Sequence, residues 1–121
     1  MGLITSQQLD AAWLIHARPY RETRYLAWFF CLEKGRVNAL AKGWRNKKAH
    51  QKALLQPFTP LMLNFSGKGQ LKYLSHLEAT SPPKPLAGKA LVCGLYANEL
   101  LARLLPEGQP SQELFTSYSL L

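Results

Sequence analysis

The sequence predicts a small closed β-barrel followed by two helices. Runs rich in aromatic and β-branched residues, separated by glycine turns, fill the first two thirds of the chain. A proline-rich segment at residues 81–85 ends that pattern, and apolar residues beyond it recur at helical spacing. Of the 121 residues, 47% are hydrophobic and 18% are charged. This composition is typical of a folded globular protein.

Five segments have the composition of strands. They are residues 11–18, 23–32, 36–43, 61–65 and 70–79. Residues 33–35 and 66–69 are predicted hairpin turns, because glycine adopts the positive φ that a tight turn needs. Pro19 and the polar residues after it are expected to end the first strand.

Side-chain alternation assigns the faces of two of these strands. In the third strand, Arg36 and Lys42 share one face. In the fifth strand, Leu71, Tyr73 and Leu77 are expected to point into the barrel. The long connection between the third and fourth strands, residues 45–56, is basic.

Five short strands with this spacing fit a closed antiparallel barrel, since closure removes exposed sheet edges. An OB-fold is the natural candidate, and an SH3-like barrel is the alternative. The predicted fold class is therefore mainly β plus α, a five-stranded OB-fold barrel followed by the first helices of an α-helical domain. The predicted division is an OB-fold nucleic-acid-binding domain over residues 1–80, then a linker and two helices of a truncated helical domain over 81–121.

The two helices are predicted at residues 87–105 and from Ser111 onward, where Ser111 is the expected N-cap. Both are strongly apolar on one side, and the sequence stops at Leu120 and Leu121 without a capping signal. Either the helices pack on another copy of the chain or the natural protein continues beyond Leu121, and we expect the second.

Positive charge is concentrated before the linker. The formal net charge is +8, and residues 1–80 hold 12 Lys and Arg against four Asp and Glu, whereas residues 81–121 hold three of each. No acidic residue occurs between positions 34 and 77. A cation cluster without acids repels itself, and an anionic partner such as nucleic acid relieves that repulsion.

The predicted nucleic-acid-binding residues are Arg18, Arg21, Arg24, Arg36, Lys42, Trp44, Arg45, Lys47, Lys48, Lys52, Lys68 and Lys72. Trp44 and Tyr20 stand among cations and are the candidate base-stacking rings. Three readings stay open besides DNA binding. The charge could belong to a solvated loop, to an RNA-binding OB module, or to a protein-interaction module for an acidic tail.

The residues favour a binding protein over an enzyme. His16, His50 and His76 lie far apart without carboxylates at metal-ligand spacing, so no metal or cofactor is expected. Cys31 and Cys93 are expected to be buried free thiols of a reducing compartment, with a single disulfide bridge as the alternative. The first ten residues lack the features of a signal peptide, and a cytoplasmic protein is expected.

Several short stretches, in this order and spacing, resemble the N-terminal half of RecO, a bacterial recombination-mediator and DNA-repair family. They are Arg18-Pro19-Tyr20-Arg21-Glu22-Thr23, Gly35-Arg36-Val37, Ala41-Lys42-Gly43, residues 55–61, Gly67-Lys68-Gly69, Leu95-Tyr96, and Asn98-Glu99-Leu100-Leu101.

The resemblance implies an OB-fold followed by a helical domain, binding of single-stranded and double-stranded DNA, and strand annealing. It also implies help in loading RecA onto strands coated by single-strand DNA-binding protein, in concert with RecR. The sequence has about half the length expected of such a protein, so functions seated in the rest of the helical domain are not implied for it. Cys31 stands where relatives often carry Thr, a departure that we read as neutral.

Overall fold

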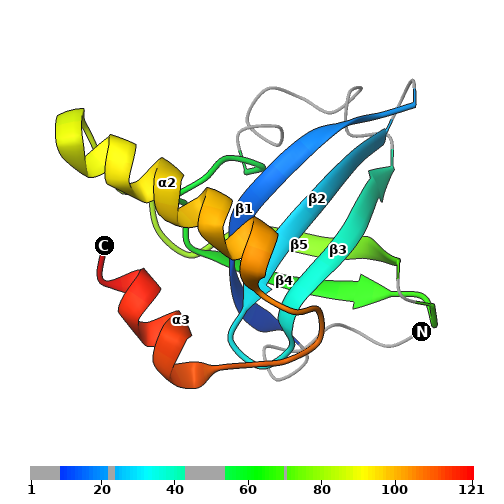
Figure 1. Cartoon of the computed structure of the whole chain (residues 1–121). Coiled ribbons are helices and arrows are strands. Elements are labelled where there is room, and N and C mark those ends of the chain that lie inside the picture. The colour runs from blue at the N-terminus through cyan, green and yellow to red at the C-terminus, as the bar shows by residue number, and fades with distance from the viewer. Residues whose placement is uncertain (1–8, 22–23, 43–53, 70) are drawn as a thin grey trace.

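The strands and helices form a barrel with two helices against one side (Figure 1). This computed structural model describes residues 9–21, 24–42, 54–69 and 71–121. The strands are β1 (Asp10–Tyr20), β2 (Arg24–Cys31), β3 (Gly35–Lys42), β4 (Leu61–Ser66) and β5 (Lys72–Ala79), and the helices are α2 (Gly88–Leu104) and α3 (Gln112–Ser119). The five predicted strands and both predicted helices are present.

The barrel closes in the order β1-β2-β3-β5-β4. Every neighbouring pair is antiparallel except β3 and β5, which pair in parallel through Ala39 with Lys72 and Leu40 with Tyr73. This is the five-stranded closed barrel of an OB-fold, so the predicted fold class is confirmed. The expectation of an entirely antiparallel barrel was wrong at this one pair, because the long connection after β3 lets β5 return in the same direction.

The barrel interior is a continuous apolar core. Its buried members are Ala12, Leu14, Ala27, Phe29, Cys31, Ala39, Leu61 and Leu63. Val37, Leu55, Phe65, Leu74 and Leu77 pack against them. Burial raises the pKa of the Cys31 thiol well above its usual value, which makes this cysteine an inert core residue. The other thiol, Cys93 on α2, is exposed, and the expectation that both are buried was wrong there.

Two β-bulges decide which side chains point inward. In β1, Leu14 pairs with Phe29 and His16 with Trp28, so Ile15 is the extra residue. In β5, Leu77 pairs with Leu63 and Leu74 with Phe65, so Ser75 is the extra residue. Each bulge reverses the alternation on one side of it.

The bulge at Ser75 overturns part of the predicted β5 face. Leu77 points inward as expected, but the second inward residue is Leu74. Leu71 and Tyr73 are exposed, at 42% and 37%. The prediction was wrong for Tyr73 because it assumed strict alternation through the strand, and wrong for Leu71 because β5 begins only at Lys72. The predicted end of the first strand at Pro19 was also wrong. β1 pairs with β4 only through residues 10–12, so Pro19 lies on a strand edge where no donor is needed.

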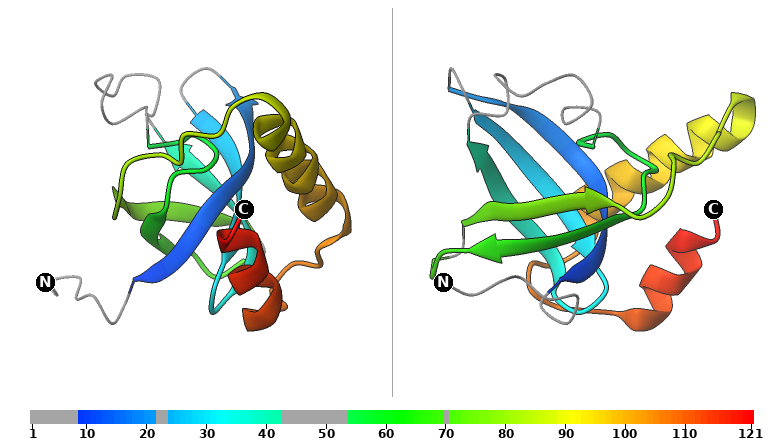
Figure 2. Two further views of the ribbon diagram at one scale, coloured as in Figure 1. Left: turned by 90° about the vertical axis from the view of Figure 1, so that its left-hand side faces the viewer. Right: turned by 180° about the vertical axis from the view of Figure 1, so that it is seen from behind.

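A second core joins the outside of β1 and β2 to the helices. Trp13, Ile15 and Phe30 of the sheet pack with Phe115 and Tyr118 of α3, and residues of α2 border them. The Phe30 ring meets the Phe115 ring edge to face at 5.3 Å between centroids. Figure 2 shows both helices against the side of the barrel that β1 forms. Ser111 caps α3 as predicted, since its Oγ accepts a hydrogen bond of 3.2 Å from the Leu114 amide.

The chain between the helices is fastened to the start of β3. The Gly108 amide donates to the Arg36 carbonyl at 3.0 Å. A Cβ at Gly35 would lie 2.6 Å from the backbone of Gln109, and Gly35 has a φ of +72°, so both the space and the conformation require glycine there. Neither α2 nor α3 is long and apolar enough to cross a membrane.

A candidate nucleic-acid interface

Predicted cations lie in a row across the outer face of the barrel. Directly opposite residues on paired strands point to the same face. Tyr20 pairs with Arg24, and Arg24 pairs with Lys42, so one row crosses β1, β2 and β3. Arg24 and Lys42 are like charges held directly opposite each other, an arrangement that costs stability and that an anion between them relieves.

A second row lies next to the first. It runs from Arg18 through Leu26 and Leu40 to Tyr73 on β5. Leu40 is only 3% exposed, whereas Arg18 and Tyr73 at the two ends are exposed. The Lys42 Nζ lies 4.6 Å from the centroid of the Tyr73 ring, which links the two rows. The result is a face with cations and tyrosines around a buried apolar centre.

The two bulges place these side chains on the outer face. If Ile15 were paired in a regular ladder, alternation from Trp13 would turn Arg18 and Tyr20 toward the barrel interior. If Ser75 were paired in the same way, alternation from Leu77 would turn Tyr73 inward. Bulges commonly re-aim side chains at the rims of barrels and beside functional sites.

The loop between β1 and β2 adds a further cation to the first row. Arg21 is exposed and has a φ of +58°. Its guanidinium carbon lies 5.4 Å from the centroid of the Tyr20 ring. A hydrogen bond from Arg21 and its positive charge lower the pKa of Tyr20. In OB-folds, this loop and the β4–β5 loop border the face that binds oligonucleotides.

The predicted residues Lys68 and Lys72 lie in the β4–β5 loop and at the first position of β5, respectively. Lys68 is exposed, and the Lys72 Nζ donates a hydrogen bond of 2.9 Å to the Gly67 carbonyl.

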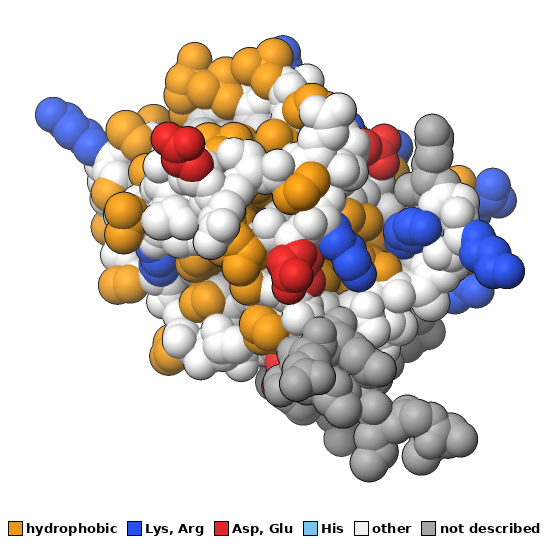
Figure 3. Space-filling model, turned by 90° about the horizontal axis from the view of Figure 1, so that it is seen from below, with side chains coloured by type: hydrophobic (Ala, Val, Ile, Leu, Met, Phe, Trp, Pro, Cys, Tyr) orange, Lys and Arg blue, Asp and Glu red, His pale blue; other side chains and the backbone are white. Residues whose placement is uncertain are grey.

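Figure 3, seen from below, shows hydrophobic side chains gathered on the helical side and several Lys and Arg side chains on the barrel side. The three ion pairs found within the described residues use none of Arg18, Arg21, Arg24, Lys42, Lys68 or Lys72.

Arg36 lies apart from this face. Its side chain is only 14% exposed and makes a 3.9 Å ion pair with Glu107, in the segment between α2 and α3. Its guanidinium carbon lies 4.8 Å from the centroid of the Trp28 ring. The structure therefore gives Arg36 an intramolecular role, and its predicted role in binding stays a prediction.

The remaining predicted residues are Trp44, Arg45, Lys47, Lys48 and Lys52, and all of them lie outside the described residues. Lys42, in the first row, is the last described residue before them.

Sequence reasoning missed Tyr73 as a surface residue. A signal was present, because Leu74 and Leu77 are three positions apart and a regular strand cannot place both on one face. A core that needs both leucines requires a bulge between them. That bulge sends Tyr73 outward.

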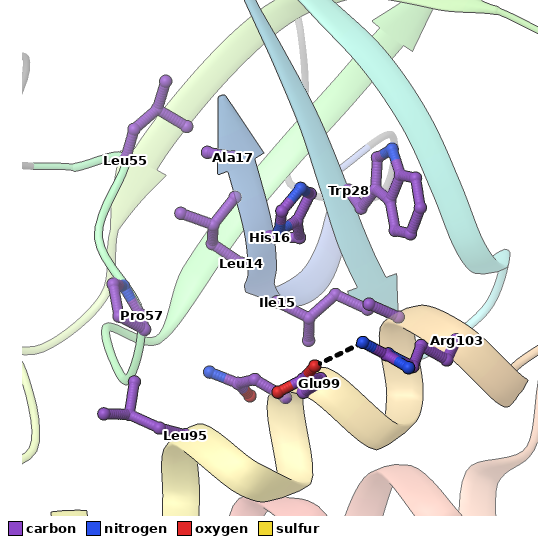
Figure 4. A pocket seen from close by; sticks show the side chains of 12 residues that line it. Leu14, Ile15, His16, Ala17, Trp28, Leu55, Pro57, Leu95, Glu99 and Arg103 are labelled. Carbon is purple, nitrogen blue, oxygen red and sulfur yellow. Dashed lines mark ion pairs between the residues drawn. The ribbon is translucent and has the colours of Figure 1, made fainter. Parts of the chain in front are cut away.

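A groove of about 730 Å³ lies between β1 and α2 (Figure 4). Leu14, Leu55, Pro57 and Leu95 give it apolar walls. Among its described lining residues, Arg103 is the single Lys or Arg, and its guanidinium pairs with the Glu99 carboxylate at 2.8 Å. The groove suits an apolar group and is separate from the cationic face.

The described residues contain no group of three or more His, Cys, Asp or Glu side chains that could hold a metal ion. Asp10, the first residue of β1, has a buried carboxylate that accepts hydrogen bonds from the Glu33 and Lys34 amides at 3.1–3.2 Å. It closes the β2–β3 turn at the end of the barrel where Arg36 lies.

Family models match almost the whole chain. Residues 6–83 match the model described as "Recombination protein O N terminal", and residues 85–120 match "Recombination protein O C terminal". The boundary between the two matches falls in the proline-rich linker.

Curated relatives agree with these matches, and the three described next are each named "DNA repair protein RecO". The protein of Alteromonas mediterranea is 49% identical over 107 residues, which are 88% of this chain and 46% of that protein. The protein of Nitrosococcus oceani is 46% identical over 92% of this chain and 45% of its own length. The protein of Pseudoalteromonas atlantica is 44% identical over 95% of this chain and 48% of its own length. The chain thus spans about half the length of the curated relatives it matches.

Proposed function

The chain belongs to the RecO family of recombination and DNA-repair proteins, and on that premise we propose that it binds DNA through the cationic face of its barrel. The observation that carries the proposal is the row formed by Tyr20, Arg24 and Lys42 across three strands. Side chains in such a row can pair with successive phosphates of one strand. The proposed ligands are single-stranded and duplex DNA.

The proposed mechanism is electrostatic. Lys and Arg side chains neutralise the phosphates of two complementary strands, lower the repulsion between them, and thereby permit annealing. The like-charged pair Arg24 and Lys42 supports this idea, because it leaves positive charge for an external anion. Such contacts carry no base identity, so binding is expected to tolerate any sequence.

The wider role follows from the family and is likewise a proposal. We expect the whole protein to act in the cytoplasm as a recombination mediator rather than an enzyme. It would assist the loading of RecA, together with RecR, onto strands coated by single-strand DNA-binding protein. Because the chain spans about half the length of its relatives, each of these partners needs to be tested on this chain directly.

The test measures the salt dependence of binding. A labelled oligothymidine is titrated with the protein at several salt concentrations, and log K should fall linearly with log salt, by about 0.7 per phosphate contact. Lys42→Gln should make the slope shallower by about 0.7, because it removes one phosphate contact. Lys89→Gln, an exposed lysine on α2, is the matched control and should leave the slope unchanged.

Matched RNA and an acidic peptide complete the experiment. Binding of DNA that is insensitive to salt, or a slope that Lys42→Gln does not change, would argue against this face. Tighter binding of the RNA would favour an RNA-binding OB module. Tighter binding of the peptide would favour an interaction module for an acidic tail.

A further inference from the structure

We propose that Tyr73 is a base-stacking residue, and that Tyr73 and Lys42 together bind one nucleotide of an unpaired strand. The ring takes the base and the ammonium takes the neighbouring phosphate. This inference rests on the proposed DNA-binding face and adds a preference for single strands, which charge alone does not give.

The position of Tyr73 suits contact with a ligand. The bulge at Ser75 turns the ring to the outer face, where 37% of the residue is exposed. The barrel interior at this level is filled by Leu74 from the same strand. The ring is therefore not needed to fill the core, and a large exposed aromatic on a cationic face is the arrangement that single-strand-binding proteins use.

The surroundings of Tyr73 hold it in place. It pairs with Leu40 of β3 on one side and Ser66 of β4 on the other. Because Tyr73 is paired on both sides, its backbone belongs to the closed part of the barrel. A platform fixed on a strand loses little conformational entropy when a base stacks on it.

The contact with Lys42 suggests how the site opens. In the free protein the Lys42 Nζ lies 4.6 Å from the centroid of the Tyr73 ring. Such a cation–π contact is weak at an exposed site, whereas an ammonium pairs strongly with a phosphate. An incoming strand can therefore draw Lys42 to its phosphate, and the ring surface that Lys42 leaves becomes available to the base.

A second tyrosine lies on the same face. Tyr20 stands in the row that contains Lys42, two strands away across Arg24, and it also lies beside a cation, Arg21. An unpaired strand that crosses β1, β2, β3 and β5 would meet an aromatic ring at each end and cations between them. Paired bases offer no free face to either ring, so a duplex would use the cations alone.

The experiment compares three single variants of the whole chain. Tyr73→Leu keeps apolar bulk over the sheet but removes the aromatic surface, and Tyr73→Phe keeps the ring. Tyr96→Leu, on α2 and 63% exposed, is the matched control away from the face. Each variant is first compared with the wild type by thermal melting. Each is then titrated with oligothymidine and with a duplex of equal length.

We expect Tyr73→Leu to weaken single-strand binding about 5- to 150-fold, while duplex binding changes less than about twofold. Tyr73→Phe and Tyr96→Leu should bind both ligands like the wild type. Equal losses for both ligands in a folded Tyr73→Leu protein, or no loss for either, would overturn the inference while salt-dependent DNA binding stood. Failure of the wild type to bind DNA would instead remove the proposed function itself. If Tyr73→Leu does not fold, Tyr73→Phe still tests the platform, because a tenfold loss of single-strand binding from a change that keeps the ring contradicts it.

Discussion

The guanidinium of Arg36 lies over the indole of Trp28, with its central carbon 4.8 Å from the ring centroid. The two residues come from adjacent strands, and Arg36 also reaches Glu107 in the segment between the helices. One cation therefore connects the barrel face to the chain that links α2 and α3. Glu107 balances part of its charge within the molecule, at 3.9 Å.

We predict that Arg36→Ala lowers stability without changing the salt dependence of DNA binding. Loss of a largely buried cation–π contact and its ion pair should cost about 1–2 kcal/mol. Arg103→Ala removes another Arg–Glu pair, but an exposed one, and should cost less than about 1 kcal/mol. Thermal or urea melts measure the stabilities. A stable Arg36→Ala protein with a shallower salt slope would place Arg36 in the DNA interface instead.

The contact between Gly94 and Phe58 leads to a second prediction. A Cβ at Gly94 would lie 2.7 Å from the Phe58 ring, which is buried against α2. Alanine in a helix gains about 1 kcal/mol over glycine, but overpacking a fixed ring costs about 1–3 kcal/mol. We therefore expect Gly94→Ala to be net destabilising. Gly69→Ala, with open space around its Cβ position, is the control and should be close to neutral. A Gly94→Ala protein that melts above the wild type would show that Phe58 moves aside freely.

The third prediction concerns pH and Asp10. Burial raises the pKa of this carboxyl, although hydrogen bonds from the Glu33 and Lys34 amides oppose the shift. The folded protein therefore binds the proton more tightly than the unfolded chain. The stability that Asp10 contributes is greatest below its unfolded pKa of about 3.9, and it falls as pH rises through the folded pKa.

Asp10→Asn removes this titration. The difference in free energy of unfolding between the wild type and Asp10→Asn should shift in favour of the wild type as pH falls from about 7 to about 4. Chemical denaturation at several pH values measures it. A difference that does not vary with pH, or that shifts the other way, would mean that the folded state does not favour the protonated carboxyl.

The fourth prediction concerns the basic loop beyond Lys42. If Lys47, Lys48 and Lys52 bind phosphates, changing all three to Ala should make the single-strand salt slope shallower by about 0.7 for each phosphate no longer neutralised. Thermal melting should be unchanged. Comparison with the salt slope of Lys42→Gln then shows which share of the phosphate contacts belongs to the loop and which to the barrel face. A slope that stays at the wild-type value would assign the phosphate binding to the barrel alone.

The strands and helices could be predicted because each depends on local sequence. Glycine turns, alternating strands and the Ser111 cap act within a few residues, and the structure has all of them. The faces of β1 and β5 could not be read by strict alternation. A bulge depends on pairing with the partner strand and on packing in the core. Leu74 points inward because it pairs with Phe65 and packs against the barrel core.

The candidate site was predictable by charge but not by position. Arg18, Arg24 and Lys42 come together because strand register aligns them, and the predicted set already contained all three. Arg36 had the same charge and the same strand face as Lys42, yet Trp28 and Glu107 surround it. Composition cannot distinguish a cation that is exposed to solvent from one that packs against an indole, because the difference lies in tertiary packing.

The extra residue in β5 also bears on how relatives of this protein could differ in length. A chain that lacked Ser75 would pair β5 with β4 without a bulge, and Leu74, Leu77 and Tyr73 would keep their present faces. A chain that lacked Leu74 would have the same length and the same regular ladder, but its serine would then lie opposite Phe65 in the core. The strand can therefore lose one residue at the bulge, Ser75, whereas deletion of Leu74 would place a serine hydroxyl inside the barrel.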